Sequence, residues 1–560
     1  MFFILCYECY WVEIRGQDSK SPTKPRSYFI NHIGYNFQKG KINQKFGKNE
    51  IIKPKQKKKR NEMDSEEVKK HNEEKEKVKK LLAEYKRKVN KEMEKHVKEM
   101  EKDEKLKEVL REIEEAQAKH PEEKRKAAKS ITEINAKHWD ELYQGDIVLS
   151  VEQAQYLLDT VTETENRALM RVKRGAAKNA REFPNHKWPM LVPFSFDSTI
   201  SSEMKAYIYE AVKLWNDNTC LNIVEDDEAS PRIQFTNIVG EGCCAHVGMQ
   251  SSDTYQNVQL EYPDCYSLGA IVHEIGHALG FVHEHGRYDR DSFVSFYPDN
   301  VHPEMLYAFQ KETSESADNY QVPYDLGSVM HYHAQMFSIN GQSTLVPRAD
   351  ASYINTIGQE YGPSLSDYFV INKHYCGLEF FPDGSTINTE VCYVTMNCDN
   401  DGFQNPDTCS TCICPQGYIG AKCQDVDIGG YATGGIANTC EGNILFATSN
   451  WQNINGQIGS KYMYSNVDYS YCHWQIFPDI GQTILIEVLD VGEQCAVGCR
   501  WGNTEIRTAA NRGATGVRLC CRSDLGSSEK LTITATNGYA LISVYSFYYI
   551  QRFSIRFRQY

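Results

Sequence analysis

Three histidines and a glutamate in the stretch HEIGHALGFVHEH could together bind a divalent metal and activate a water molecule beside it. His273 and His277 are four residues apart, so on a helix their imidazoles lie on one face, one turn apart. Glu274 follows the first histidine and can take a proton from water without being a ligand. Gly280 lies between His277 and His283. Glycine adopts backbone conformations that other residues avoid, so the helix can stop there and the third imidazole can return to the metal.

A helix whose histidines lie at its surface or in its core is the alternative interpretation. A bare His-Glu-x-x-His pattern leaves that alternative open, whereas the added glycine and third histidine at fixed spacing disfavour it. Three neutral imidazoles leave one coordination position for water, and zinc lowers the pKa of that water toward neutrality. The pattern therefore predicts one catalytic Zn2+ ion, with Glu274 as general base.

The elements around these residues are those of a globular enzyme. LGAIVHEIGHALGF is predicted to be a helix, and so is SSEMKAYIYEAVKLWNDNT, which carries Met204, Ile208, Ala211 and Trp215 on one face. LVPFSFD and RIQFTNI are predicted to be strands. The candidate site is therefore expected in a domain of mixed helices and strands.

The chain resembles the astacin family of zinc metalloendopeptidases, which are metzincins. The resemblance is carried by HEIGHALGFVHEH, by SVMHY at residues 328–332 and by CYSLGAIVHE immediately before the helix. It implies an α+β protease domain at residues 175–378, with two lobes around a zinc cleft. It also implies that His273, His277 and His283 bind the zinc ion and that Glu274 is catalytic.

The resemblance implies roles for three further residues. Tyr332 is expected to be an additional zinc ligand that swings away to stabilise the transition state. Met330, in the Met-turn, is expected to form the apolar floor beneath the metal. Glu284 is expected to pair with the N-terminus that maturation creates. Without the resemblance, a lone methionine or tyrosine would be interpreted as a core residue.

A latent precursor is the expected form of the protein. LYQGDIVLS at 142–150 resembles the astacin pro-segment motif, in which an aspartate takes the zinc's open position, so Asp146 is expected to block the site. RVKR at 171–174 is typical of a processing-protease site, although a basic surface loop is the alternative. Cleavage after Arg174 is the chemical expectation, whereas alignment with the family places the mature start near Asn179.

Charge divides the chain into two parts. Residues 1–174 carry 40 Lys and Arg against 32 Asp and Glu, and residues 175–560 carry 22 against 43, which argues against nucleic-acid binding by the acidic part. Residues 1–19 are a possible signal peptide, and residues 20–174 form the pro-region. Within it, Lys and Glu dominate residues 62–130, and a thin apolar seam predicts a long solvated helix, or a weak coiled coil, without chemistry. The seam consists of Val78, Leu82, Tyr85, Val89, Met93, Val97 and Met100.

The 19 cysteines indicate secretion. Cys6 and Cys9 are followed by none until Cys220, and 17 lie from there onward. That density is typical of disulfide-built domains from an oxidising compartment. The sequence contains no run of 18 apolar residues, so no membrane span is expected.

Two modules are expected after the protease. Residues 388–424 resemble an EGF-like module, and residues 440–560 resemble a CUB domain whose alternating runs, such as TILIEVLDV, predict an all-β sandwich. Both are expected to bind matrix or protein ligands, or to act as spacers. The disulfides that the resemblance implies are Cys220–Cys376, Cys243–Cys265, Cys392–Cys409, Cys398–Cys412, Cys414–Cys423, Cys440–Cys472 and Cys499–Cys520, with Cys495–Cys521 as a further pair. Cys244 is left over, either free or bridging outside the domain.

These observations predict a secreted zinc endopeptidase, made as a zymogen, that hydrolyses peptide bonds in extracellular proteins. One alternative is a catalytically silent adhesion or scaffold protein that acts through its EGF-like and CUB modules. The presence of Glu274 and of all three histidines counts against it. A second alternative is a zinc hydrolase with a non-peptide substrate. The expected extended cleft with an edge strand favours peptides instead.

Overall fold

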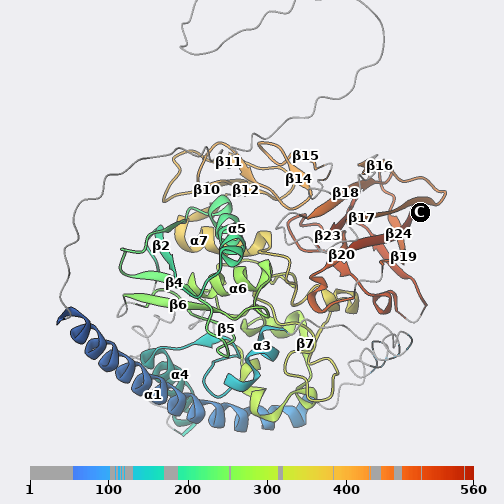
Figure 1. Cartoon of the computed structure of the whole chain (residues 1–560). Helices are drawn as coiled ribbons and strands as arrows, with labels where there is room; N and C mark the ends of the chain where they lie inside the picture. The colour runs from blue at the N-terminus through green and yellow to red at the C-terminus, as the bar shows by residue number, and fades with distance from the viewer. Residues whose placement is uncertain are drawn as a thin grey trace, which may run out of the picture. The chain divides into compact units, whose positions relative to one another are not determined.

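The computed structural model describes helix α1 (Lys55–Met100) and most of the chain from residue 130 onward (Figure 1). The continuous described ranges are 55–100, 130–169, 187–250, 254–312, 319–381, 384–427, 443–459, 469–492, 495–526, 528–547 and 549–560. The possible signal peptide at 1–19 and the basic cluster at 171–174 lie outside them. Contacts divide the chain into two units, Met1–Ser65 and Glu66–Tyr560, and the second unit contains every element after α1.

A six-stranded mixed sheet is the framework of the domain that holds the candidate site. Its strand order is β1-β5-β6-β4-β2-β3. Neighbouring strands are parallel except β5 and β6, which are antiparallel. The strands are β1 (Ile147–Val148), β2 (Leu191–Phe196), β3 (Asn222–Glu225), β4 (Arg232–Thr236), β5 (Cys243–His246) and β6 (Tyr255–Leu260). The segment expected to be the pro-region (residues 20–174) therefore supplies the outermost strand, β1, and covers the edge that β5 would otherwise present.

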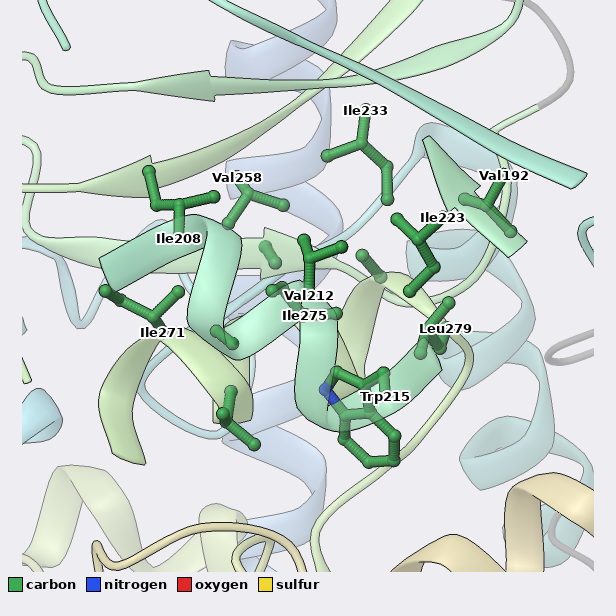
Figure 2. Close-up of a cluster of buried hydrophobic side chains, with 14 of the residues drawn as sticks. Val192, Ile208, Val212, Trp215, Ile223, Ile233, Val258, Ile271, Ile275 and Leu279 are labelled. Atoms are coloured by element: carbon green, nitrogen blue, oxygen red, sulfur yellow. The ribbon is translucent and has the colours of Figure 1, made fainter. Parts of the chain in front are cut away.

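Two helices pack together against this sheet, α5 (Ser202–Asn218) and α6 (Leu268–Ala278). Ser201 begins α5 by accepting a hydrogen bond from the backbone N–H of Met204, and Ser267 begins α6 through Ala270 in the same way. Each buried aliphatic side chain between them contributes about 1.5–3 kcal/mol to stability. Figure 2 shows this core, in which labelled side chains of α5 and α6 meet those of the strands: Val192, Ile208, Val212, Trp215, Ile223, Ile233, Val258, Ile271, Ile275 and Leu279.

A second apolar cluster joins the expected pro-region to the part of the expected protease domain (residues 175–378, called the catalytic domain below) that follows α6. The catalytic domain contributes β7 (Val294–Phe296), η6 (Pro303–Phe309) and β8 (Leu345–Pro347). The pro-region contributes α1, the segment around β1 and α4 (Val151–Leu169). Ser150 and Gln153 form a capping box at the start of α4, with reciprocal hydrogen bonds of 2.8 and 3.2 Å.

The expectation that the charged helix is solvated is wrong for one face of the described part of α1. Val78, Leu82, Tyr85 and Val89 are at most 8% exposed because they pack into the second cluster. The thin apolar seam of α1 is buried because it lies against another part of the chain. Helical periodicity alone does not identify that part. The described part of this helix runs from Lys55 to Met100, and between residues 101 and 129 the structure describes only isolated positions.

The remaining described chain forms a helix, a small disulfide-rich module and a β-sandwich. The helix is α7 (Leu365–Cys376). The module contains β9 (Leu378–Phe380), β10 (Ser385–Asn388), β11 (Met396–Asn397), β12 (Phe403–Gln404), β13 (Cys412–Ile413), β14 (Tyr418–Ile419) and β15 (Asp425–Val426). The sandwich contains β16 (Ile444–Phe446), β17 (Gln452–Gly459), β18 (Ser470–Phe477), β19 (Ile484–Asp490), β20 (Gly502–Arg507), β21 (Val517–Leu519), β22 (Leu531–Ala535), β23 (Ala540–Ser546) and β24 (Ile550–Gln559). Five strands form one sheet and four the other. The expected fold class, an α+β catalytic domain followed by a disulfide-rich module and an all-β sandwich, is confirmed.

Eight disulfides lie within the described residues, and they join the cysteines that the resemblance paired. The catalytic domain has Cys220–Cys376 and Cys243–Cys265; the small module has Cys392–Cys409, Cys398–Cys412 and Cys414–Cys423; the sandwich has Cys440–Cys472, Cys495–Cys521 and Cys499–Cys520. Cys244 is a free, buried thiol. None of the described helices is long and apolar enough to cross a membrane.

A buried ionic group connects the sandwich to both neighbouring parts of the chain. Glu505 accepts hydrogen bonds from Arg507 (2.6 Å) and Arg518 (3.2 Å). Arg518 also donates to Gln359 of the catalytic domain (3.0 Å), and Arg507 donates to the carbonyl of Gln416 in the small module (2.6 Å). Burial raises the pKa of Glu505, but the two guanidinium groups lower it more, to about 2. The charged form of Glu505 is therefore required for this junction.

Replacing Glu505 with glutamine is expected to destabilise the sandwich by about 3–5 kcal/mol near neutral pH, because two buried guanidinium groups lose their counter-ion. The native pKa of Glu505 lies below the value of about 4.3 in an unfolded chain. The contribution of Glu505 to the free energy of unfolding is therefore complete above the unfolded-chain pKa and declines as the pH falls toward 2. Scanning calorimetry of wild type and variant should show a gap in melting temperature at pH 7 that narrows at pH 3. Asp479→Asn, at an exposed carboxylate of the same sandwich, is the control; an equal gap at both pH values would contradict the prediction.

Candidate metal centre

Helix α6 presents the first two histidines of the site on one face. The imidazole Nδ1 of His273 donates to the carbonyl of Val329 (2.8 Å), and that of His277 donates to the carbonyl of Phe281 (2.9 Å). Because each Nδ1 donates a proton to a carbonyl, each Nε2 keeps its lone pair, which is what a metal requires. The ring centroids of the two histidines are 4.7 Å apart.

Gly280 ends α6 and allows the third histidine to join the first two. Its φ angle is +110°, a region that L side chains rarely adopt. The N–H of Gly280 donates to the carbonyl of His277 (2.8 Å), and that of Phe281 donates to the carbonyl of Gly276 (3.0 Å). These two bonds form a Schellman motif. The chain then turns so that the His283 ring lies 4.8 Å from that of His277.

The pro-region residue Asp146 lies at the point where the three imidazoles meet. Its carboxylate oxygens are 3.6 Å from Nε2 of His273, 3.7 Å from Nε2 of His277 and 3.2 Å from Nε2 of His283. All four side chains are buried, and their candidate ligand atoms lie within 4.8 Å of one another. The predicted ligands and the predicted blocking residue are therefore brought together.

This cluster fits a zinc ion. In the described part of the chain, Nε2 of His273, Nε2 of His277 and Oδ1 of Asp146 are buried without a hydrogen-bond partner. Such atoms are rare in folded proteins because each costs free energy, and a cation among them would satisfy all of them. Ligand atoms about 2 Å from a tetrahedral ion lie roughly 3.3 Å from one another, close to the measured separations. Three imidazoles and one carboxylate are a ligand set typical of zinc.

Electrostatics in the cluster favour an ionised Asp146 and neutral His277 and His283, whereas His273 is shifted toward its charged form. Burial, reinforced by neighbouring histidines, lowers the pKa of His277, and burial also lowers that of His283. Burial opposes protonation of His273 as well, but Asp146 outweighs it and raises that pKa. Burial raises the pKa of Asp146, yet the surrounding histidines hold it well below its usual range.

Glu274 lies beside the first ligand and is completely buried. Neither of its carboxylate oxygens has a hydrogen-bond partner among the described residues. Burial, and then repulsion by Asp146, raise its pKa well above the usual value. A carboxylate with a raised pKa and no competing donor is suited to accept a proton.

Met330 lies against helix α6, directly beneath the site. A Cβ atom on Gly276 would be 2.8 Å from the sulfur of Met330, so a larger residue at 276 would collide with it. The N–H of Glu284 donates to the carbonyl of Met330 (2.9 Å). The Met-turn thus contacts both the helix and the segment after His283.

Tyr332 lies next to the third histidine. Its ring stacks on His285, with centroids 3.5 Å apart, and its centroid is 4.6 Å from that of His283. Its hydroxyl donates to the backbone carbonyl of Gln144 in the pro-region. The tyrosine hydroxyl is therefore hydrogen-bonded to the segment that contains Asp146.

Glu284 is bound within the catalytic domain. It accepts hydrogen bonds from Arg287 (3.0 Å) and from the N–H of Asp325 (3.0 Å). Burial raises its pKa to about 8, although Arg287 acts in the opposite direction. Its expected partner, the mature N-terminus, lies outside the described residues.

Two residues of the site were not identified from the sequence. Gln144 accepts a hydrogen bond from Nδ1 of His283 (2.8 Å), so the pro-region holds the third histidine as well as the metal position. Its place two residues before Asp146 was the only signal. Asp367, in α7, accepts hydrogen bonds from the hydroxyl of Ser328 (2.6 Å) and from the N–H of Val329 (3.0 Å) and so fixes the Met-turn. No local pattern indicates that contact.

Known proteins are similar to this chain, and the similarity includes the domain that holds the site. A family model described as Astacin, a peptidase family, matches residues 180–376. Zinc metalloproteinase nas-31 of Caenorhabditis elegans is 32% identical over 393 residues, which cover 70% of this chain and 60% of that protein. Zinc metalloproteinase nas-28 of the same organism is 30% identical over 424 residues, which cover 74% of this chain and 79% of that protein. High choriolytic enzyme 1, a hatching enzyme zinc-protease from Oryzias latipes, is a solved structure with 29% identity and a TM-score of 0.31 that covers 36% of this chain and 98% of its own.

Proposed function

Because this chain belongs to the astacin family of zinc metalloproteinases, we propose that it is a secreted zinc endopeptidase, made as a latent zymogen, that hydrolyses extracellular proteins. The observation that carries the proposal is the convergence of His273, His277, His283 and Asp146, with the unpartnered Glu274 beside them. The eight disulfides support an oxidising compartment. Asp146 in the position that water would take supports latency.

The residues of the site support hydrolysis of a peptide bond. Zinc held by the three histidines supplies Lewis-acid chemistry, which acidifies water and polarises the carbonyl of a peptide. Glu274 accepts a proton from the attacking water and delivers it to the nitrogen of the leaving amine as the C–N bond breaks. Once the pro-region has left, the Tyr332 hydroxyl loses its bond to Gln144 and is free to donate to the developing oxyanion.

The edge strand β5 supports a peptide substrate over a small molecule. In the zymogen, Ile147 and Val148 pair in parallel with Ala245 and His246 of β5. When β1 leaves, the same backbone groups become available to an extended substrate, which they would bind as an added strand. The disulfide-rich module and the sandwich, as EGF-like and CUB domains, are proposed to bind matrix or protein ligands.

Maturation is proposed to occur at the basic cluster at 171–174, with Glu284 pairing with the new amino terminus. A buried carboxylate whose pKa is raised to about 8 is suited to a cationic partner, which would restore its charged form. N-terminal sequencing of the secreted protein tests export and the cleavage position together. A first residue between 175 and 180 is expected.

The overall proposal is tested on the secreted chain after cleavage at 171–174 and complete removal of the pro-region. One zinc per chain is expected by mass spectrometry, together with hydrolysis of a denatured protein substrate that a chelator abolishes and added zinc restores. A correctly cleaved protein that is free of its pro-region and retains zinc, but hydrolyses no peptide bond, would instead favour a scaffold.

Replacing Tyr332 with phenylalanine is expected to lower kcat about 10²-fold with little change in KM. The removed hydroxyl would donate a hydrogen bond to the oxyanion of the transition state, but not to the bound substrate. Steady-state kinetics on a fluorogenic peptide measure both constants. Tyr255→Phe, at an exposed tyrosine in β6, is the control. A rise in KM alone would assign Tyr332 to substrate binding.

A further inference from the structure

The buried face of α1 contacts both residues 139–148, which contain Asp146 and are here called the inhibitory segment, and the catalytic domain. Leu82 and Tyr85 are 1% and 3% exposed, whereas Glu84 and Arg87, on the opposite side, are exposed. The apolar partners of the buried face belong to the cluster that contains η6 and β7. This attachment therefore involves residues that are not part of the metal site.

Tyr85 is the centre of the contact. Its ring lies 5.9 Å from that of Tyr143, in the inhibitory segment, and 6.4 Å from that of Tyr307, in η6. The hydroxyl of Tyr307 in turn donates to the carbonyl of Leu142 (3.1 Å). Three tyrosines thus join α1, the inhibitory segment and the catalytic domain at one point.

Lys86 reinforces this point with its charged end. Its ammonium group donates to the carbonyls of Trp139 and Leu142 and lies 4.5 Å from the centroid of the Tyr307 ring. Burial lowers its pKa to about 8, which fits a group enclosed by the contact. The ammonium binds the inhibitory segment just before Gln144 and Asp146.

Ion pairs and one polar contact extend the attachment along the helix. Lys75 pairs with Glu141 (2.8 Å), Lys79 pairs with Asp140 (2.5 Å), and Asn90 donates to the carbonyl of Pro303 in η6 (3.1 Å). Exposed ion pairs contribute little. The apolar face and Lys86 are therefore expected to provide most of the affinity.

Cleavage at 171–174 would cut the chain after α4 without breaking any of these contacts. We propose that the cleaved pro-region stays on the catalytic domain as a non-covalent inhibitor, held by α1, and that activity appears only when α1 is removed or destroyed. The proposal rests on the proposed function, since it concerns the release of that zymogen. It assigns to the lysine- and glutamate-rich helix a docking role that is separate from the blocking of zinc by Asp146.

The test uses the complete secreted zymogen, cleaved at 171–174 by an arginine-directed processing protease and then passed over a size-exclusion column. Co-elution of the pro-region with the catalytic domain and low peptide hydrolysis are expected for wild type. Leu82→Ala and Tyr85→Ala should each raise the dissociation constant of the pro-region at least tenfold, because large buried side chains are truncated. Glu84→Ala and Arg87→Ala, on the exposed side, should leave it unchanged.

Two further arms separate this proposal from its alternatives. In Asp146→Ala the zinc position is unblocked, yet the cleaved pro-region should still co-elute if α1 docks independently. The mature chains of all α1 variants have the wild-type sequence, so their hydrolysis rates after complete release of the pro-region should be equal. If Leu82→Ala prevents folding of the zymogen, the milder Leu82→Val replaces it. Complete separation of the wild-type pro-region at micromolar concentration, or wild-type behaviour of Leu82→Ala and Tyr85→Ala, would overturn the proposal. Co-elution without any activity after release would contradict the proposed function instead.

Discussion

Replacing Glu274 with glutamine is expected to lower kcat/KM for peptide hydrolysis by about 10²–10⁴-fold while the protein keeps its zinc. The amide has nearly the shape of the carboxylate, so the buried position beside His273 is filled as before. It cannot accept a proton from water, however, and it carries no charge. The expected loss is therefore one of chemistry and not of binding or folding.

Kinetics on a fluorogenic peptide and metal analysis of the same preparation check this result. Glu203→Gln, in the first turn of α5 at an exposed position, controls for the effect of the substitution itself. Loss of zinc together with activity would place Glu274 among the residues that maintain the metal site. Activity within tenfold of wild type would show that another group moves the proton.

Replacing Asp146 with alanine is expected to give the uncut chain at least tenfold more activity on a short peptide than uncut wild type. Charged contacts of the kind that Asp146 makes are worth about 1.5–3 kcal/mol each, and 1.4 kcal/mol corresponds to tenfold. Alanine leaves the pairing of β1 with β5 in place, so the activity should remain below that of the mature enzyme.

The comparison requires chains that are protected from cleavage. Arg174→Ala is therefore introduced both into the wild-type chain and into the Asp146→Ala chain. Asp159→Ala, at an exposed position in α4, is the matched control. An uncut Asp146→Ala chain as inactive as wild type would mean that the contacts of β1 and α1 are sufficient for latency.

The zinc ligands could be predicted because they are encoded locally. His273, His277, Gly280 and His283 lie within eleven residues, and their spacing on a helix that stops at a glycine determines their geometry. The cysteine pairs and Asp146 depend instead on long-range geometry, and they were reached through resemblance to a family.

Other features that depend on contacts between distant segments, for which the family resemblance gave no guide, were not predicted. The seam of α1 has ordinary helical spacing, and nothing in it identifies η6, more than 200 residues away, as its partner. Gln144 and Asp367 act through single hydrogen bonds to His283 and to the Met-turn. Periodicity predicts which side of an element is apolar, but not what covers it.

The junction around Glu505 limits how these parts can be exchanged in evolution. Arg518 reaches Gln359 of the catalytic domain, and Arg507 reaches Gln416 of the small module, so one carboxylate serves three parts of the chain. A gene fusion that replaced the sandwich with an unrelated one would leave Gln359 facing an ill-matched surface. The protease and its C-terminal partners are thus expected to be inherited as one piece, and a catalytic domain cut at residue 378 should be less soluble and less heat-stable than the whole chain.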